Sequence, residues 1–254
     1  ITYGTAGSEA SPYDDAWKRR AIVEQPDGLF VSVLFDEGGQ VFGEAKTDAD
    51  PSGSPMNTWA TLAVRSSDAL IDEIATPANI TGYTHSTGAF TRSTTDGLVR
   101  VVAREGSGSL TGFIEGYEYK SGSTGTAYVE RQMDYSARDL TIGSATLHVP
   151  FVTAQRAVFA DNETSGTLAA VDYDETTVSR TYWSSTATDI GSIRPKAITT
   201  TLPAVVLAEN GENVAHTRIA YVRENGHTAF VKAEDGIYDY MEYDDGLMVE
   251  SIRD

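Results

Sequence analysis

Four stretches of the sequence repeat one pattern, in which two apolar, β-prone runs flank a glycine-containing bend. They cover residues 29–48, 98–118, 156–175 and 218–235, with bends near Gly39, Gly108, Gly166 and Gly226. In the last copy the bend is Asn225-Gly226, which predicts a type I′ turn because both central residues of such a turn need positive φ. The pattern therefore predicts four antiparallel hairpins.

The bends recur at intervals of 69, 58 and 60 residues. A recurrence of this length is typical of stacked supersecondary units, each of which needs neighbours to cover its faces. Helical periodicity is missing except in residues 67–75 (SDALIDEIA), where Ser67 is a candidate cap and Pro77 a stop signal. We expect an all-β, antiparallel fold of about four hairpin units, arranged like a propeller or a β-sandwich, with one short helix near 67–75.

The chain reads as one all-β domain over residues 1–254. Two places could hold a boundary within it: the Gly/Ser-rich stretch near 120–126 and the Thr-rich extended stretch near 186–203, which contains Pro195.

Composition limits the partners that the chain can have. The net charge is −18, from 19 basic and 37 acidic residues, which argues against nucleic acid because phosphate contacts need clustered Lys and Arg. The excess of carboxylates resembles the surface chemistry of proteins from salty environments. No apolar run reaches the roughly 18 residues of a membrane-spanning helix. The absence of cysteine excludes disulfides and thiolate metal sites.

One loop resembles the first half of a calcium-binding loop. Asp48, Asp50 and Ser52 place side-chain oxygens at alternate positions, and Gly53 allows a sharp turn after them. The twelfth position holds Trp59 where such loops carry Glu, so a polar surface turn is the alternative interpretation. We expect no cofactor other than weakly bound Ca²⁺ at this loop.

The C-terminal run alternates aromatic and acidic residues. On a strand, Tyr238, Tyr240, Glu242 and Asp244 point to the same face, where rings could stack on the C–H faces of a sugar and carboxylates could bind its hydroxyls. Tyr182 and Trp183 form a second, smaller aromatic set. The alternative interpretation is an amphipathic edge strand whose acids discourage pairing with other chains.

No Gly-x-Ser-x-Gly elbow, phosphate loop or zinc-type histidine spacing occurs in the sequence. We therefore expect a non-enzymatic, extracellular or particle-surface module, as in a virion or appendage, that associates with itself, joins a larger assembly or binds glycans. The alternative is a polysaccharide-active hydrolase or lyase with a carboxylate pair or a Tyr/His pair in a sheet cleft.

Overall fold

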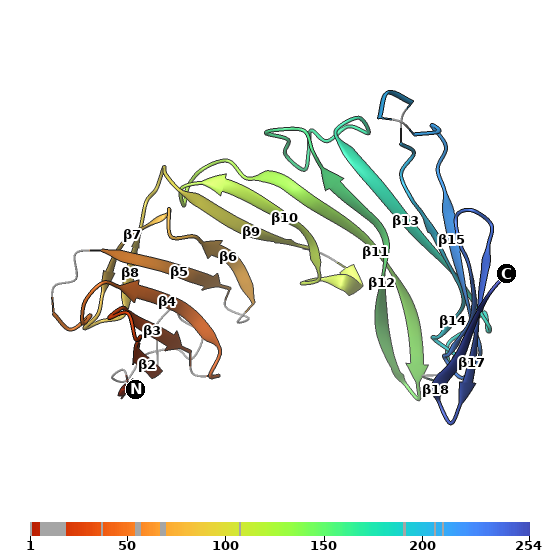
Figure 1. The fold of residues 1–254 in the computed structure, drawn as a ribbon, viewed down its shortest axis with the longest axis horizontal. Helices are drawn as coiled ribbons and strands as arrows, with labels where there is room; N and C mark the ends of the chain where they lie inside the picture. The colour runs from red at the N-terminus through yellow and green to blue at the C-terminus, as the bar shows by residue number, and fades with distance from the viewer. Residues whose placement is uncertain are drawn as a thin grey trace. The chain divides into compact units, whose positions relative to one another are not determined.

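The computed structural model describes residues 2–5, 19–36, 38–53, 57–66, 70–106, 108–189, 192–205, 207–209 and 211–254. In these ranges the chain forms antiparallel strands, and the helical segments are two 3-10 turns, η1 (Gly108–Leu110) and η2 (Leu207–Glu209) (Figure 1). The prediction of an all-β, antiparallel fold is confirmed.

Eighteen strands are described. The first nine are β1 (Thr2–Thr5), β2 (Arg19–Glu24), β3 (Phe30–Phe35), β4 (Val41–Thr47), β5 (Thr58–Arg65), β6 (Ile71–Ala75), β7 (Ile80–Thr84), β8 (Ala89–Arg92) and β9 (Leu98–Arg104). The others are β10 (Ile114–Ser121), β11 (Tyr128–Ile142), β12 (Ala145–Val158), β13 (Tyr173–Tyr182), β14 (Pro195–Thr201), β15 (Thr217–Val222), β16 (Thr228–Lys232), β17 (Tyr238–Asp244) and β18 (Leu247–Arg253).

Sixteen of these strands form one sheet whose order follows the sequence. Strands that follow each other in the sequence are neighbours in this sheet, except that β6 pairs with β9 while β7 and β8 form a separate two-stranded sheet. Sequential pairing is what short connections between neighbouring strands favour. Across the described ranges, the predicted hairpin strand pairs are therefore parts of one large sheet, with one small two-stranded sheet in addition.

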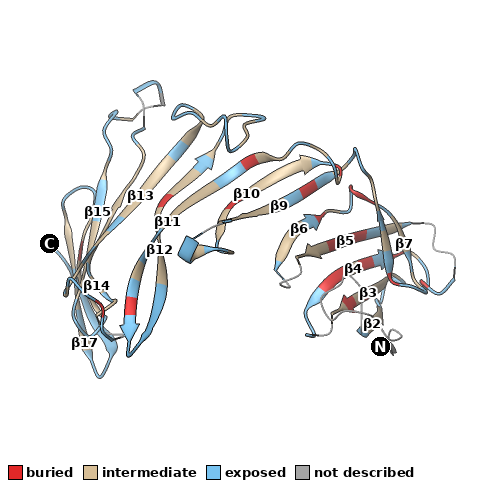
Figure 2. Cartoon of the chain, turned by 180° about the vertical axis from the view of Figure 1, so that it is seen from behind, coloured by how far each residue is buried: buried red, intermediate tan, exposed pale blue. Residues whose placement is uncertain are grey.

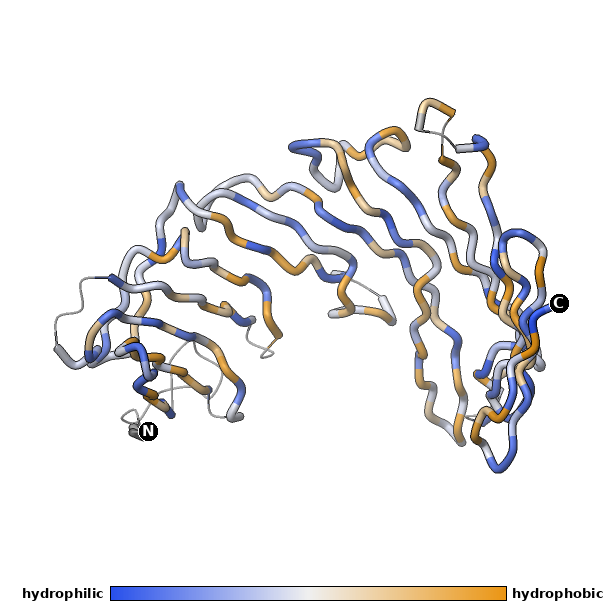
Figure 3. The backbone as a smooth tube through the Cα atoms, in the orientation of Figure 1, coloured by the Kyte–Doolittle hydropathy of each residue, from blue (hydrophilic) through white to orange (hydrophobic). Residues whose placement is uncertain are grey.

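Contacts divide the chain into two compact units. Unit 1 comprises Ile1–Ala103, Gly116–Glu130 and Asn162–Gly166, and unit 2 comprises Arg104–Glu115, Arg131–Asp161 and Thr167–Asp254. Buried residues, red in Figure 2, are concentrated in unit 1, whereas most of the strand surface of unit 2 is partly or fully exposed. In both units, hydrophobic and hydrophilic residues alternate along the strands (Figure 3).

The core of unit 1 lies between the large sheet and the β7–β8 hairpin. Leu34, Gly43, Leu62 and Ala75 are opposed in turn across β3, β4, β5 and β6, so they share one face of the sheet. The ring of Phe90, from β8, covers this row: a Cβ added to Gly43 would lie 2.7 Å from Phe90 Cε2. Glycine therefore lets the hairpin approach the sheet closely.

Four connections use the same five-residue turn. They are Gln25–Leu29, Asp36–Gln40, Arg223–His227 and Ala233–Ile237. In each, the N–H of the first residue donates to the C=O of the fifth, and the glycine in fourth place donates its N–H to the C=O of the first, at distances of 2.7–3.1 Å. The glycines have φ of 79–93°. In the three turns whose five residues are all described, this pattern is typical of a type I turn followed by a bulge glycine.

The hairpins predicted at Gly39 and Gly226 are confirmed, but the turn type was wrong. Asn225 is not among the described residues with positive φ, so Asn225-Gly226 does not form a type I′ turn. A two-residue turn with positive φ at both positions does occur between β17 and β18, where Asp245 and Gly246 have φ of 45° and 83°.

The other two predicted bends are not tight hairpin turns. Gly108 opens the 3-10 turn η1 within a loop between β9 and β10, and Gly166 lies in the long connection between β12 and β13. Both strand pairs exist, so the prediction of paired strands holds. The prediction that all four glycines share one setting is wrong.

The prediction of a helix near 67–75 is wrong for residues 71–75. Residues 67–69 lie outside the described residues, and residues 71–75 form strand β6. An isolated helix of this length is marginal, whereas β6 gains hydrogen bonds to β5 on one edge and β9 on the other. Ala75 is fully buried there and Ile74 is exposed, so burial follows the strand period.

Candidate functional site: an aromatic surface on unit 2

Three aromatic side chains lie side by side across strands β15 to β17. Tyr221 is opposed to Phe230, and Phe230 is opposed to Tyr240, so all three share one face of the sheet. The ring centroids are 4.3 Å apart for Tyr221 and Phe230 and 5.6 Å apart for Phe230 and Tyr240. Tyr238 lies on the same face, 5.8 Å from Phe230. We call Tyr221, Phe230, Tyr238 and Tyr240 the aromatic row.

Trp183 adds a further ring at one end of the row. It follows β13 directly, and its indole Nε1 donates a hydrogen bond of 3.1 Å to the carbonyl of Val222, next to Tyr221. Lys196, the extra residue where the pairing of β13 and β14 shifts, holds its ammonium 5.1 Å from the Trp183 ring centroid. The indole is thus held by its edge while 45% of the residue stays exposed.

These side chains line a groove of about 580 Å³. Its apolar wall is Trp183, Tyr221 and Phe230, and its polar groups include Lys196, Glu224 and Asn225. A pocket of this size, mostly apolar with a few polar groups, is typical of small-molecule sites. The turn that carries Glu224 and Asn225 is the five-residue turn Arg223–His227, so the groove is built on a hairpin with fixed register.

Arg138 fixes the segment that carries Trp183. From β11 it donates hydrogen bonds to the carbonyls of Ser184, at 2.7 Å, and Ser192, at 3.0 Å. Its guanidinium carbon lies 3.7 Å from the ring centroid of Tyr182. One arginine therefore orders both ends of the segment after β13.

The predicted site residues are only partly brought together. Tyr238 and Tyr240 belong to the aromatic row, and Trp183 lines the groove. Tyr182 does not line the groove, since its ring packs against Phe151, with centroids 6.2 Å apart, beside a separate hollow of about 390 Å³.

Glu242 and Asp244 lie farther along β17 and do not line the groove. They are opposed to Glu250 and Leu247 of β18. Sequence reasoning missed Lys196, Tyr221 and Phe230 as site residues. The signal for the last two was available, because the turn at Gly226 opposes Tyr221 to Phe230 within the predicted hairpin.

A larger hollow of about 720 Å³ is acidic rather than aromatic. It is lined by Glu212, His216, Arg218, Val231, Ala233, Glu234, Asp235 and Asp239. Arg253 lies 3.6 Å from Asp235 and 3.9 Å from Asp239, so two of these carboxylates have a cation close by. Among the described residues, no three His, Cys, Asp or Glu side chains come together as metal ligands.

The loop with calcium-like spacing forms a hydrogen-bonded turn. Oδ1 of Asp50 accepts from the N–H of Ser52, at 2.9 Å, and from its hydroxyl, at 2.7 Å. These hydrogen bonds lower the pKa of Asp50 below its ordinary value. Asp48 accepts a hydrogen bond of 2.7 Å from the side-chain amide of Asn57. The side-chain oxygens of Asp48 and Asp50 thus accept hydrogen bonds from different residues of the loop.

One Tyr/His pair lies in unit 2. The rings of His227 and Tyr243 have centroids 4.5 Å apart and planes 30° apart, which is a packing contact between two rings.

No family model matches the sequence, and no curated protein matches it. The chain is similar in fold to the crystal structure of TcdB2-TccC3, at 11% identity and a TM-score of 0.37, and to that of TcdB2-TccC3-Cdc42, at 10% identity and 0.37. It is also similar to the Photorhabdus luminescens Tc holotoxin pore carrying TccC3-D651A, at 11% identity and 0.33. Each match covers 94% of this chain but only 13–14% of the other.

At this level of similarity the neighbours share a β-rich fold with the chain and establish no function for it. The described residues contain no helix that is both long enough and apolar enough to cross a membrane.

Proposed function

We propose that unit 2 is a non-enzymatic glycan-binding β module of an extracellular or particle surface. The observation that supports this most is the groove that Trp183, Tyr221 and Phe230 line together. Sugar rings present apolar C–H faces that stack on such rings, and aromatic stacking favours binding without much loss of side-chain entropy.

The polar groups of the groove can form hydrogen bonds with the hydroxyl and carboxylate groups of a sugar. The Lys196 ammonium and the Asn225 amide can donate to hydroxyl or carboxylate oxygens, and the Glu224 carboxylate can accept from hydroxyls. Tyr238 and Tyr240 extend the aromatic surface beyond the groove, so a chain of several sugars would find a second stacking position.

A glycan array followed by titration calorimetry with the best ligand tests this proposal. Trp183→Ala should weaken binding at least tenfold, about 1.4 kcal/mol, because it removes the most exposed ring of the groove. Trp59→Ala is the matched control: Trp59 is 50% exposed but lies on β5 of unit 1, and binding should not change. Absence of any glycan ligand, or equal loss in both variants, would refute the proposal.

The same ligand separates this function from the enzymatic alternative. A binding module leaves the glycan intact, so no new reducing ends should appear during prolonged incubation. Their release would support a hydrolase or lyase instead.

A further inference from the structure

The groove that Trp183 lines differs in charge from the rest of the chain. Of the described residues that line it, Lys196 and Arg223 are cationic and Glu224 alone is acidic. The chain as a whole carries 37 acidic and 19 basic residues. The larger hollow of unit 2 follows that excess, since four carboxylates, one arginine and one histidine line it. The groove is therefore a cationic place on an acidic protein.

A third cation lies against the turn that borders the groove. Nη1 of Arg194 donates a hydrogen bond of 3.4 Å to the backbone carbonyl of Glu224. Its Cζ and Nη1 atoms lie 3.5 Å from the position that a Cβ on Gly226 would occupy. The Arg194 guanidinium thus lies beside the five-residue turn that carries Glu224 and Asn225.

None of these three charges is neutralised within the described part of the chain. No ion pair there joins Arg194, Lys196 or Arg223 to a carboxylate. Arg223 donates a hydrogen bond of 3.4 Å to the carbonyl of Met241, and the Lys196 ammonium packs over Trp183. All three cationic residues are exposed. Lysine has three N–H donors and arginine five, so donors remain for a ligand.

We propose that the ligand of the groove is an anionic glycan, whose sugars carry carboxylate or sulfate groups; this inference rests on the proposed glycan-binding function. A sugar that stacks on Trp183 has its substituents next to the Lys196 ammonium, which lies 5.1 Å from the ring centroid. The Arg223 guanidinium presents a planar fork of N–H donors that matches two oxygens of one anionic group. The Glu224 carboxylate can accept from the hydroxyls of the same sugar.

The overall negative charge of the chain opposes this binding only weakly. Charges farther away than about 8 Å are largely screened at an ionic strength of about 0.15 M, so the nearest charges decide. The acids Glu242 and Asp244 of β17 do not line the groove. Because each exposed ion pair contributes little by itself, the three cations together should favour an anionic sugar over a neutral one by about tenfold.

Binding to matched pairs of glycans tests the proposal. Oligogalacturonate and its methyl ester share rings and linkages and differ in charge, as do a sulfated galactan oligosaccharide and its desulfated form. By titration calorimetry, an anionic member should bind about tenfold more tightly than its neutral counterpart in about 0.15 M NaCl. The preference should fall below about threefold in about 1 M NaCl, where the Debye length is about 3 Å. The first pair reports recognition of carboxylate and the second recognition of sulfate.

Charge variants locate the preference. Lys196→Gln combined with Arg223→Gln should lower it to less than about threefold, because glutamine keeps hydrogen-bond donors but carries no charge. Each single variant should show an intermediate preference, which serves as the measurement if the double variant binds too weakly. The control combines Arg131→Gln with Arg218→Gln, two exposed arginines of unit 2 that do not line the groove. It changes the net charge equally and should keep the preference.

The outcomes separate this inference from the function on which it rests. Neutral members that bind as tightly as anionic ones would overturn the inference and leave the glycan-binding function standing. A preference that survives in the groove variants, or that falls equally in the control, would also overturn the inference. No binding by any neutral or anionic glycan would refute the inference and the proposed function together.

Discussion

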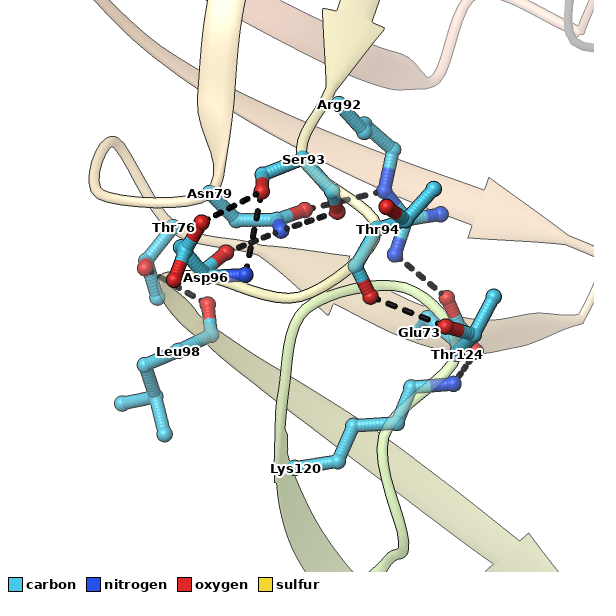
Figure 4. Close-up of polar contacts among 10 residues, drawn as sticks. All are labelled: Glu73, Thr76, Asn79, Arg92, Ser93, Thr94, Asp96, Leu98, Lys120 and Thr124. Carbon is cyan, nitrogen blue, oxygen red and sulfur yellow. Dashed lines mark hydrogen bonds and ion pairs between the residues drawn. The ribbon is translucent and has the colours of Figure 1, made fainter.

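Lys120 donates a hydrogen bond of 2.5 Å to Oε1 of Glu73, which links β10 to β6 across the intervening strand β9. The other carboxylate oxygen of Glu73 accepts a hydrogen bond of 2.7 Å from Arg92 of β8 (Figure 4). One carboxylate therefore joins the small β7–β8 sheet to the large sheet in unit 1. All three side chains are less than 20% exposed, so water screens these ion pairs little.

The first prediction concerns the pH dependence of this link. Burial acts to raise the pKa of Glu73, but the hydrogen bonds and charges of Lys120 and Arg92 outweigh it and hold the pKa below its ordinary value of 4.5. Because the folded pKa is depressed, the stabilisation is complete above the unfolded pKa and is lost as pH falls through the folded pKa. Glu73→Gln should cost about 2 kcal/mol at pH 7 and progressively less below pH ~4.5.

Urea unfolding of both proteins between pH 7 and pH 3 measures this difference. The effects of the other carboxylates cancel because both proteins contain them. Glu130→Gln is the control, since Glu130 is about half exposed and lies 3.7 Å from an exposed Arg100. It should cost less than about 1 kcal/mol at any pH. A Glu73→Gln cost that stays constant down to pH 3 would contradict the assignment.

The second prediction compares two glycines from the same short motif. Gly28 and Gly97 both stand between Asp and Leu, with φ of 83° and 80°. A Cβ on Gly28 would meet nothing within 4 Å, whereas a Cβ on Gly97 would lie 2.2 Å from the backbone of Ala78. Gly28→Ala should thus cost about 1 kcal/mol, from the strained φ alone, and Gly97→Ala at least twice as much. Thermal melts compare them, and equal costs would show that the contact with Ala78 relaxes freely.

The fold was predictable wherever local chemistry decided it. The turns at Gly39 and Gly226 follow from residues that tolerate positive φ, and the flanking strands follow from alternation. Strand β6 was not predictable, because residues 71–75 suit a helix locally and form a strand only through pairing with β5 and β9. The order of the strands also depends on such long-range pairing, which no local pattern contains.

The candidate site was predictable only in part, for a related reason. Tyr238 and Tyr240 could be placed on one face from the strand period alone. Lys196 approaches Trp183 because the pairing of β13 and β14 shifts by one residue there, and no feature of the sequence predicts that bulge. Residues that are adjacent in the sequence also have different surroundings here: Trp183 contacts the carbonyl of Val222, while the ring of Tyr182 packs beside Arg138.

The third prediction concerns calcium at the loop of Asp48, Asp50 and Ser52. If the loop binds Ca²⁺ weakly, millimolar calcium should raise the melting temperature of the wild type and a chelator should reverse the rise. Asp50→Asn keeps an oxygen that can accept from Ser52 but removes the charge, so the turn should persist and the calcium effect should shrink. A melting temperature that changes neither on addition of calcium nor on addition of chelator would exclude a calcium site in this loop.

The fourth prediction concerns Asn79, which is fully buried and is connected to Glu73 through Arg92 (Figure 4). Its side-chain amide donates to the carbonyls of Ser93, at 2.9 Å, and Asp96, at 2.8 Å, while its oxygen accepts from Arg92 Nε at 3.1 Å. Asn79→Asp keeps the shape but replaces both donors with an oxygen facing two carbonyls. It should cost about 3 kcal/mol in urea unfolding, since buried acceptors lose their partners. The control Asn57→Asp, on an exposed amide, should cost under about 1 kcal/mol. Equal costs would mean that water or a local shift relieves the two carbonyls in the Asn79→Asp variant.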